Sequence, residues 1–511
     1  MKHIVIVGGG TAGWMAAINL ASRFPAKQIT VVEPSRLGPI GVGESVTGVV
    51  QDFISNPINQ LSQQDFFRRS DAMLKLGIWY HDGHGPNTEF LSPIDNPYFL
   101  FESSHPEDLE AFYATATMSG ASICEEQIHG RLMRAGLTDY YRKPDGTISD
   151  DLSTASLQFD SLKFTAWLRD VAAERPSIRH LDDSIRTFEQ ESETGFITEL
   201  ILESDQRLAG DCCVDCMGFA RRLFQHACQP RWTDYGDYLK VDRAIPIFVE
   251  HEEGELPVCT SATALPHGWI WRVPTQMRIG CGYVYSSKYI DDDQAVAEMR
   301  AAGLDPGAAP RVFTFQPGRF ETQWEKNVAC ISMSGLFLEP IEATTIHMFY
   351  GQIKALTELY LPFYSSESQP VLSRDYNEWM RPMYDSMLDY VSFHYLTGRS
   401  DTEFWRDCQR PEAITDRNQH RREMWQHRFP VREDFDGIRT FRFGASTGLL
   451  IWAPMLAALG FFRKEHAATL VEASAYSQRT QRNVNRYLDA RAFLLSQAIR
   501  QREAVKHLRG E

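Results

Sequence analysis

The feature that most constrains this chain is an apolar run at its N-terminus that leads directly into a glycine turn. Residues 4–7 are continuously apolar, as expected for a parallel strand that is covered on both faces. The glycines that follow have the spacing Gly8-x-Gly10-x-x-Gly13. In such a turn, Gly8 permits the sharp bend, Gly10 lets a pyrophosphate approach the backbone, and Gly13 lets helix and strand pack closely. The sequence therefore predicts a strand, a phosphate-binding turn and a helix.

A second apolar strand supports this prediction. Residues 29–32 are apolar or β-branched and end in Glu33, twenty residues after Gly13. An acidic residue at this place accepts hydrogen bonds from an adenosine ribose. The N–H groups of Thr11 and Ala12, at the start of the helix, are predicted to face the phosphates. We expect a doubly wound α/β core that binds FAD or NAD; a glycine turn in another kind of α/β protein is the alternative.

A second glycine loop follows this unit. In Gly41-Val42-Gly43-Glu44, two glycines flank an apolar residue, so the backbone can lie against a flat ring. We predict that these four residues contact the cofactor. An apolar strand at 213–219 ends in Asp and Gly, where a doubly wound fold returns to its nucleotide.

The remaining chain divides into segments of different periodicity. Residues 51–90 are predicted to be helical, 87–105 to form an irregular loop, and 376–510 to be mainly helical. Residues 240–290 alternate apolar and polar side chains, which is typical of an antiparallel sheet. The uncharged run at 444–462 contains Pro454 and three glycines, so we interpret it as a buried or pocket-lining segment rather than a membrane span.

We expect one large body built from two parts. Residues 1–350 would form a discontinuous nucleotide-binding module, with inserted segments of a substrate lobe at about 50–150. Residues 351–511 would complete that lobe, which is largely helical. The net charge of −15 argues against a nucleic-acid surface, and nine scattered cysteines with no leader segment suit a reduced cytoplasm.

One strand of the expected antiparallel sheet carries a specific motif. The segment Gly268-Trp269-Ile270-Trp271-Arg272-Val273-Pro274 resembles the WxWxIP signature of flavin-dependent halogenases, the tryptophan halogenase family, with Val273 in place of Ile. In that family Trp269 and Trp271 would stand near the flavin, where they are thought to hinder monooxygenase chemistry, and Pro274 completes the motif. The alternative is a pair of core tryptophans in a sheet.

The segment Lys75-Leu76-Gly77-Ile78-Trp79 is similar to the family's catalytic lysine segment, Lys-x-x-x-Trp. The resemblance implies that the Lys75 ammonium hydrogen-bonds hypohalous acid, or that its amine becomes a haloamine. Either way, it would hold an electrophilic halogen far from the flavin. Without this context, a surface lysine would be the expected reading.

The segment Gly335 to His347 resembles the family's G-F-x-E-P-L-E-[SA]-T motif. The resemblance implies that Glu342 assists halogenation and that the backbone at Thr344 and Thr345 binds halide. It also implies that Gly335 and Leu338 contact the flavin. A helix N-terminal carboxylate is the alternative role of Glu342. Smaller matches occur at 278–285, 394–395 and 401–406, so the likeness extends over roughly 1–410.

Together these matches imply an FADH2-dependent halogenase with an FAD-binding doubly wound core. The substrate would be an indole, a tryptophan-like compound or a phenol, and chloride or bromide would be the halide. No second GxGxxG is found for a nicotinamide, so a separate flavin reductase is expected to supply FADH2. An FAD-dependent aromatic hydroxylase and a flavin-binding protein without chemistry are the alternatives. We expect no metal at Cys213-x-x-Cys216, no nucleic-acid or membrane partner, and leave a homodimer open.

Overall fold

The computed structural model describes residues 1–34, 44–101, 107–120, 122–435, 446–472 and 477–511. The chain forms two compact units, each built from three segments. The first unit contains Met1–Asp71, Asp160–Gly236 and Thr314–Tyr384; the second contains Ala72–Phe159, Asp237–Phe313 and Asp385–Glu511. The expected boundary at residue 350 lies inside helix α10 (Thr344–Lys354), which belongs to the first unit.

The first unit is organised around a six-stranded sheet with the order β10-β2-β1-β14-β23-β22. Neighbouring strands are parallel except at β22, which is antiparallel to β23. The strands are β1 (His3–Val7), β2 (Gln28–Val32), β10 (Ile178–Leu181), β14 (Cys212–Asp215), β22 (Trp324–Glu325) and β23 (Val328–Cys330). The predicted returning strand is thus β14, paired directly with β1.

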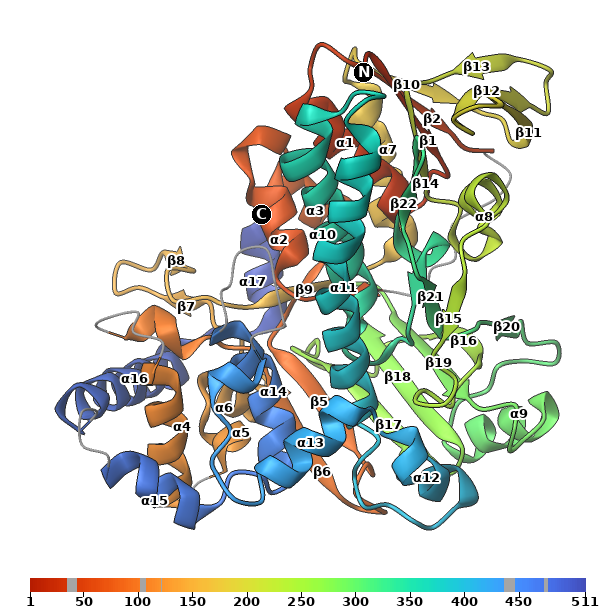
Figure 1. Ribbon diagram of the computed structural model, residues 1–511. Helices are drawn as coiled ribbons and strands as arrows, with labels where there is room; N and C mark the ends of the chain where they lie inside the picture. Colours follow the sequence, from red (N-terminus) through yellow and green to blue (C-terminus); the bar gives the residue numbers. More distant parts are fainter. Residues whose placement is uncertain (35–43, 102–106, 121, 436–445, 473–476) are drawn as a thin grey trace. The chain divides into compact units, whose positions relative to one another are not determined.

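Both faces of this sheet are covered, as its continuous apolar strands require (Figure 1). Helices α1 (Thr11–Arg23) and α7 (Ser161–Ala173) pack on one face, and α10 packs against α1. On the other face, Val5, Val7 and Cys213 share a core with β12 (Ile197–Leu202) and α8 (Arg222–Cys228). The predicted doubly wound α/β fold is therefore confirmed.

Smaller elements complete the first unit. They are β3 (Glu44–Ser45), β11 (Ile185–Gln190), β13 (Arg207–Ala209), β15 (Trp232–Asp234), β21 (Gly318–Phe320), β24 (Leu336–Phe337), α2 (Val49–Ser55) and α3 (Gln63–Arg69). A π-helical turn, Ala355–Tyr360, continues α10.

The second unit contains a seven-stranded sheet with the order β20-β16-β19-β18-β17-β5-β6. Its strands are β5 (Gly77–His81), β6 (Glu89–Pro93), β16 (Arg243–Val249), β17 (Thr260–Leu265), β18 (Gly268–Pro274), β19 (Ile279–Tyr285) and β20 (Phe313–Thr314). The pairs β17–β18, β18–β19 and β16–β19 are antiparallel, so the prediction for 240–290 is confirmed. Helix α9 (Asp292–Ala301) shares a core with Ile245, Ile270 and Tyr283 of this sheet.

The rest of the second unit is largely helical, with short strands β4 (Met73–Lys75), β7 (Tyr141–Arg142), β8 (Ile148–Ser149) and β9 (Ser156–Phe159). Its helices are α4 (Glu107–Ser119), α5 (Ile123–Glu126), α6 (Ile128–Ala135), α12 (Glu403–Asp407), α13 (Asp416–Met424), α14 (Ser446–Ala458), α15 (Lys464–Glu472), α16 (Ser477–Gln497) and α17 (Gln501–Arg509). Helix α11 (Gln369–Phe393) begins in the first unit and ends in the second.

The prediction that residues 51–90 are helical is wrong for its second half. After α2 and α3 the chain forms β4 and β5, and β6 lies inside the expected irregular loop. The apolar run at 72–80 is compatible with either a buried helix or a buried strand, and periodicity cannot separate the two. The partner strands decide: β4 pairs with β9, and β5 lies between β17 and β6. No helix in the described ranges, α14 included, has the length and apolar character needed to span a membrane.

Candidate functional site

The glycine turn has a different packing requirement at each of its three positions. Gly8 has φ +104°, and a Cβ there would lie 2.3 Å from the carbonyl oxygen of Cys216. A Cβ on Gly13 would lie 1.9 Å from the carbonyl oxygen of Gly8, so only glycine fits both positions. At Gly10 a Cβ would have no atom within 4 Å among the described residues. The backbone at Gly10 is therefore open on the side where a phosphate would approach.

Glu33 lies beside this turn and provides an acceptor for a ribose. Its side chain covers Gly9, where a Cβ would lie 2.2 Å from the carboxyl carbon. The residue is 8% exposed, and its Oε2 has no hydrogen-bond partner among the described residues. Burial raises the pKa of this carboxyl, although the charge of Arg169 opposes the effect. The nearest basic group to Oε2 is His180 Nε2 at 3.8 Å, beyond hydrogen-bond distance, so this buried acceptor fits a ribose hydroxyl.

The structure describes some of the other predicted cofactor-contact residues but not all of them. Thr11 begins α1, and its hydroxyl lies 2.9 Å from that of Thr165; Ala12 is buried. Gly41, Val42 and Gly43 lie outside the described residues, and Glu44 begins β3. A Cβ on Gly335 would lie 2.6 Å from the Cys330 sulfur, and Leu338 is fully buried.

The backbone of the predicted halide site is unusual. Glu342 has φ 61° and ψ 3°, and Ala343 has φ 52° and ψ 40°, so two consecutive non-glycine residues are left-handed. Such conformations cost about 1–2 kcal/mol per residue and cluster at functional sites. Thr344 then returns to the right-handed conformation and begins α10. Left-handed residues followed by a right-handed one at a helix N-terminus are the backbone pattern of an anion-binding nest, and here the Ala343 N–H donates to the Pro340 carbonyl at 3.1 Å.

Two buried side chains of α10 determine the polarity and charge around this predicted halide site. The Thr344 residue is 3% exposed, and its hydroxyl has no hydrogen-bond partner among the described residues. His347 is also buried, and burial lowers its pKa to about 4, so its ring is neutral near pH 7. Its Nδ1 lies 2.9 Å from the Thr47 hydroxyl. The orphaned hydroxyl and the positive helix end fit a small anion.

A buried amide network supports the loop before this nest. Ser332 has φ +65°, and its N–H donates to Gln352 Oε1 of α10 at 2.9 Å. Gln323 Nε2 donates to the Gly335 carbonyl at 3.1 Å, and the Tyr384 hydroxyl donates to Gln323 Oε1 at 2.5 Å. Nothing in the sequence points to these residues, because they come from separate segments and match no motif.

Lys75 is the last residue of β4 and is 2% exposed, so it is a buried lysine and not a surface one. It pairs with Ser156 of β9. Burial raises the pKa of the Cys259 thiol to about 12, and the positive charge of Lys75 opposes this rise. A buried ammonium is rare in proteins and marks a candidate functional group.

Trp269 and Trp271 lie on β18 with ring centroids 6.3 Å apart and an interplanar angle of 63°. Trp271 covers Gly282 of β19, where a Cβ would lie 2.1 Å from the indole ring. Pro274 ends β18 and is buried. Period-two spacing places both indoles on one face of β18, where they meet edge to face.

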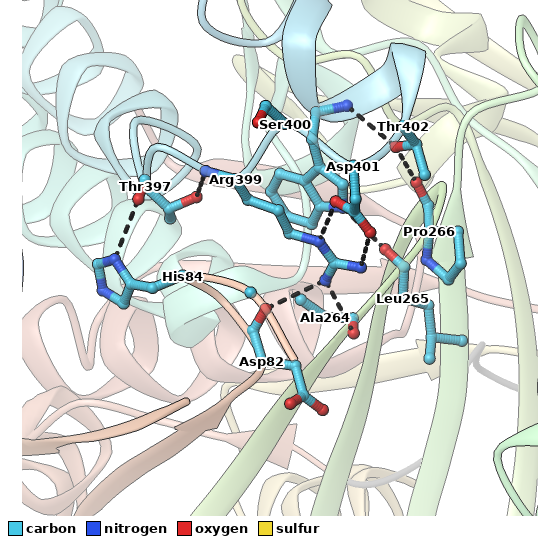
Figure 2. Close-up of polar contacts among 12 residues, drawn as sticks. Asp82, His84, Ala264, Leu265, Pro266, Thr397, Arg399, Ser400, Asp401 and Thr402 are labelled. Carbon is cyan, nitrogen blue, oxygen red and sulfur yellow. Dashed lines mark hydrogen bonds and ion pairs between the residues drawn. The ribbon is translucent and has the colours of Figure 1, made fainter. Parts of the chain in front are cut away.

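Residues 397–405 form hydrogen bonds to the turn between β17 and β18, which precedes these tryptophans (Figure 2). The buried Arg399 donates to the carbonyl oxygens of Asp82 and Ala264 at 3.1 and 3.2 Å, and to both carboxylate oxygens of Asp401. Thr402 donates to the Pro266 carbonyl at 2.7 Å. Part of the segment at 401–406, which resembles a family motif, therefore has a structural role in holding the β17–β18 turn.

The predicted site residues are distributed over both units. Lys75 and the tryptophans belong to the second unit, whereas the glycine turn, Glu342 and Thr344 belong to the first. Cys213 and Cys216 are buried with raised thiol pKa values caused by burial. Within the described ranges no three His, Cys, Asp or Glu side chains gather as a metal site would need.

Comparisons with known proteins agree with these local features. A family model described as tryptophan halogenase matches residues 3–456. The tryptophan 7-halogenase RebH of Lentzea aerocolonigenes is 30% identical over 425 residues, covering 80% of this chain and 78% of the relative. The structure of BrvH, a flavin-dependent halogenase from Brevundimonas sp. BAL3, has a TM-score of 0.82 and 27% identity, covering 99% of each chain. A tryptophan halogenase structure from Shewanella frigidimarina shares the fold, with a TM-score of 0.87 and 23% identity, covering 100% of this chain and 98% of that one.

Proposed function

The chain belongs to the tryptophan halogenase family of flavin-dependent halogenases, and we propose that it uses Lys75 and Glu342 to halogenate an electron-rich aromatic ring. Membership of the family implies the use of FAD, halide and an aromatic substrate. The observation that carries the finer proposal is the burial of Lys75, which is 2% exposed within an otherwise apolar segment. A buried cationic side chain marks a candidate functional group.

When bound, reduced FAD delivered by a separate flavin reductase would activate dioxygen, which would oxidise both the flavin and the halide to give FAD, hypohalous acid and water. The chain's own residues would hold FAD through the Gly8–Gly13 turn and Glu33. The Thr344 and Thr345 backbone, together with the Thr344 hydroxyl, would hold the halide. These assignments are supported by the open backbone at Gly10, the buried acceptor of Glu33 and the orphaned hydroxyl of Thr344.

The Lys75 ammonium would hydrogen-bond hypohalous acid and hold its halogen toward the ring. The ring carbon forms a bond to the halogen, the oxygen–halogen bond breaks, and the ring proton leaves. Glu342 would accept that proton, and the net reaction converts the arene and hypohalous acid into haloarene and water. The strained Glu342 backbone would set the direction of this carboxylate.

We propose an indole, a tryptophan-like compound or a phenol as the substrate, because electrophilic halogenation requires an electron-rich ring. An aromatic hydroxylase is the competing function, and the WxW pair favours halogenation over it. The test is mass spectrometry of indole and phenol panels with FAD, a flavin reductase and either chloride or bromide. The isotope pattern of the product identifies the halide, whereas a hydroxylated product without halide would refute the proposal.

The lysine assignment has its own test. Lys75→Met should abolish halogenated product while FADH2 oxidation by dioxygen continues. Lys163→Met is the control, because that side chain is 46% exposed and pairs with Asp71. Halogenation retained by Lys75→Met would overturn the role of Lys75.

A further inference from the structure

A buried histidine holds the backbone immediately after Lys75. His129 of α6 is 1% exposed, and its Nδ1 lies 3.1 Å from the carbonyl oxygen of Leu76. Its Nε2 lies 3.0 Å from Oδ2 of Asp139, which is 0% exposed. His129 therefore links the residue that follows Lys75 to a carboxylate in the core of the second unit.

The hydrogen bonds determine the protonation state of this ring. The Leu76 carbonyl can only accept, so Nδ1 must carry a proton. Asp139 Oδ2 already accepts N–H groups from Thr154 at 2.8 Å and Ala155 at 3.0 Å, which requires it to be an unprotonated oxygen. Nε2 lies closer to this oxygen than to the Thr154 hydroxyl, which is 3.5 Å away, and donation from Nε2 to Oδ2 makes the ring an imidazolium. Burial alone would lower the pKa of His129, but Asp139 and Asp95 outweigh it and raise the pKa.

The neighbouring backbone is held from several directions. Gln501, which is 0% exposed, donates to the Leu74 carbonyl at 2.6 Å. The Leu76 N–H donates to the Val258 carbonyl at 2.8 Å, and the Leu76 carbonyl accepts from the Ile94 N–H at 3.1 Å. Lys75 thus lies between Leu74 and Leu76, whose carbonyl oxygens both accept hydrogen bonds from buried side chains. The hydrogen bond from His129 to Leu76 is charge-assisted, and such hydrogen bonds are stronger than neutral ones.

We propose that His129, kept as an imidazolium by Asp139, is a positioning residue for Lys75. It fixes the turn between β4 and β5 and thereby the direction of the Lys75 ammonium. This inference rests on the proposed role of Lys75 in halogenation, and it adds a pair of residues that no motif of the sequence identifies. A displacement of about 1 Å in such a group costs on the order of a hundredfold in rate.

Two matched variants separate positioning from general stability. In His129→Asn the amide reaches the place of Nδ1 and can still donate to Leu76, whereas in His129→Gln it reaches the place of Nε2 and can donate only toward Asp139. Both lose the ring and the charge. The yield of halogenated product per FADH2 oxidised should fall about tenfold or more in His129→Gln. It should stay within about threefold of the natural protein in His129→Asn. In the Gln variant, hypohalous acid should instead escape to an added diketone trap.

The charge itself is tested without turnover. Histidine-selective ¹⁵N NMR of the apoprotein should show His129 doubly protonated at pH 7; the facing acids are Asp139 and Asp95. A neutral ring at pH 7, or equal loss of yield in both variants, would overturn the inference. If the natural protein makes no halogenated product while the NMR signal is that of an imidazolium, the proposed function fails and the ion pair stands.

Discussion

Replacing Thr344 with valine should stabilise the apoprotein and weaken halide binding at the same time. The Thr344 hydroxyl is buried without a hydrogen-bond partner among the described residues. An unsatisfied buried polar group costs about 1–3 kcal/mol, and valine has nearly the same shape without the hydroxyl. We therefore expect Thr344→Val to raise the free energy of unfolding by about 1–2 kcal/mol.

Halide binding should change in the opposite direction. A hydrogen bond to a charged group contributes about 1.5–3 kcal/mol, so its loss should raise the KM for halide about tenfold or more. A readout without turnover is available. Bromide, compared with sulfate at equal ionic strength, should raise the urea midpoint of the natural apoprotein more than that of the variant.

Thr357 provides the matched control. It is 3% exposed like Thr344, but its hydroxyl has acceptors in reach, because Asn19 Oδ1 and the Ile353 carbonyl oxygen each lie 2.8 Å away and it can donate its one proton to either. Thr357→Val should therefore destabilise the protein by about 1–3 kcal/mol and leave the KM for halide unchanged. If Thr344→Val destabilises the protein as Thr357→Val does, or if its halide KM is unaltered, the reasoning about the orphaned hydroxyl is refuted.

Two further predictions concern pH and packing. Glu110 of α4 has a pKa raised to about 7, mainly by burial, although it accepts the Arg432 N–H at 2.9 Å. Because the folded state binds this proton more tightly, Glu110 stabilises the fold below pH about 4.5 and loses that contribution as pH rises toward 7. In urea unfolding between pH 4.5 and 8, the free energy of unfolding should fall by up to about 3 kcal/mol through Glu110, and Glu110→Gln should abolish this decrease. An unchanged pH dependence in the variant would contradict the assignment. Gly282→Ala should destabilise the protein by about 1–3 kcal/mol, because its Cβ would meet the Trp271 ring at 2.1 Å. The tryptophan emission should shift, and an unaltered spectrum would show that the ring is not packed there.

The sequence alone determined the features that depend on residues close together in the chain. The turn from Gly8 to Gly13 and the two flanking strands form one local unit, so spacing was enough to predict them. The motifs at Lys75, Trp269 and Glu342 were equally local, and the family that they indicated is the family to which the chain belongs.

Only the tertiary structure decided what depends on distant partners. Residues 73–75 and 77–81 are strands because β9 and β17 offer edges to pair with, which no local pattern reveals. The left-handed backbone at Glu342 and Ala343 is equally unforeseen, because neither residue type favours that conformation. The pKa of His129 is raised, against the effect of burial, because folding places Asp139 and the Leu76 carbonyl, 53 residues earlier in the chain, beside its two ring nitrogens. A sequence pattern reports local conformational preference, whereas the protonation state and backbone strain of a residue depend on the groups that the tertiary structure brings next to it.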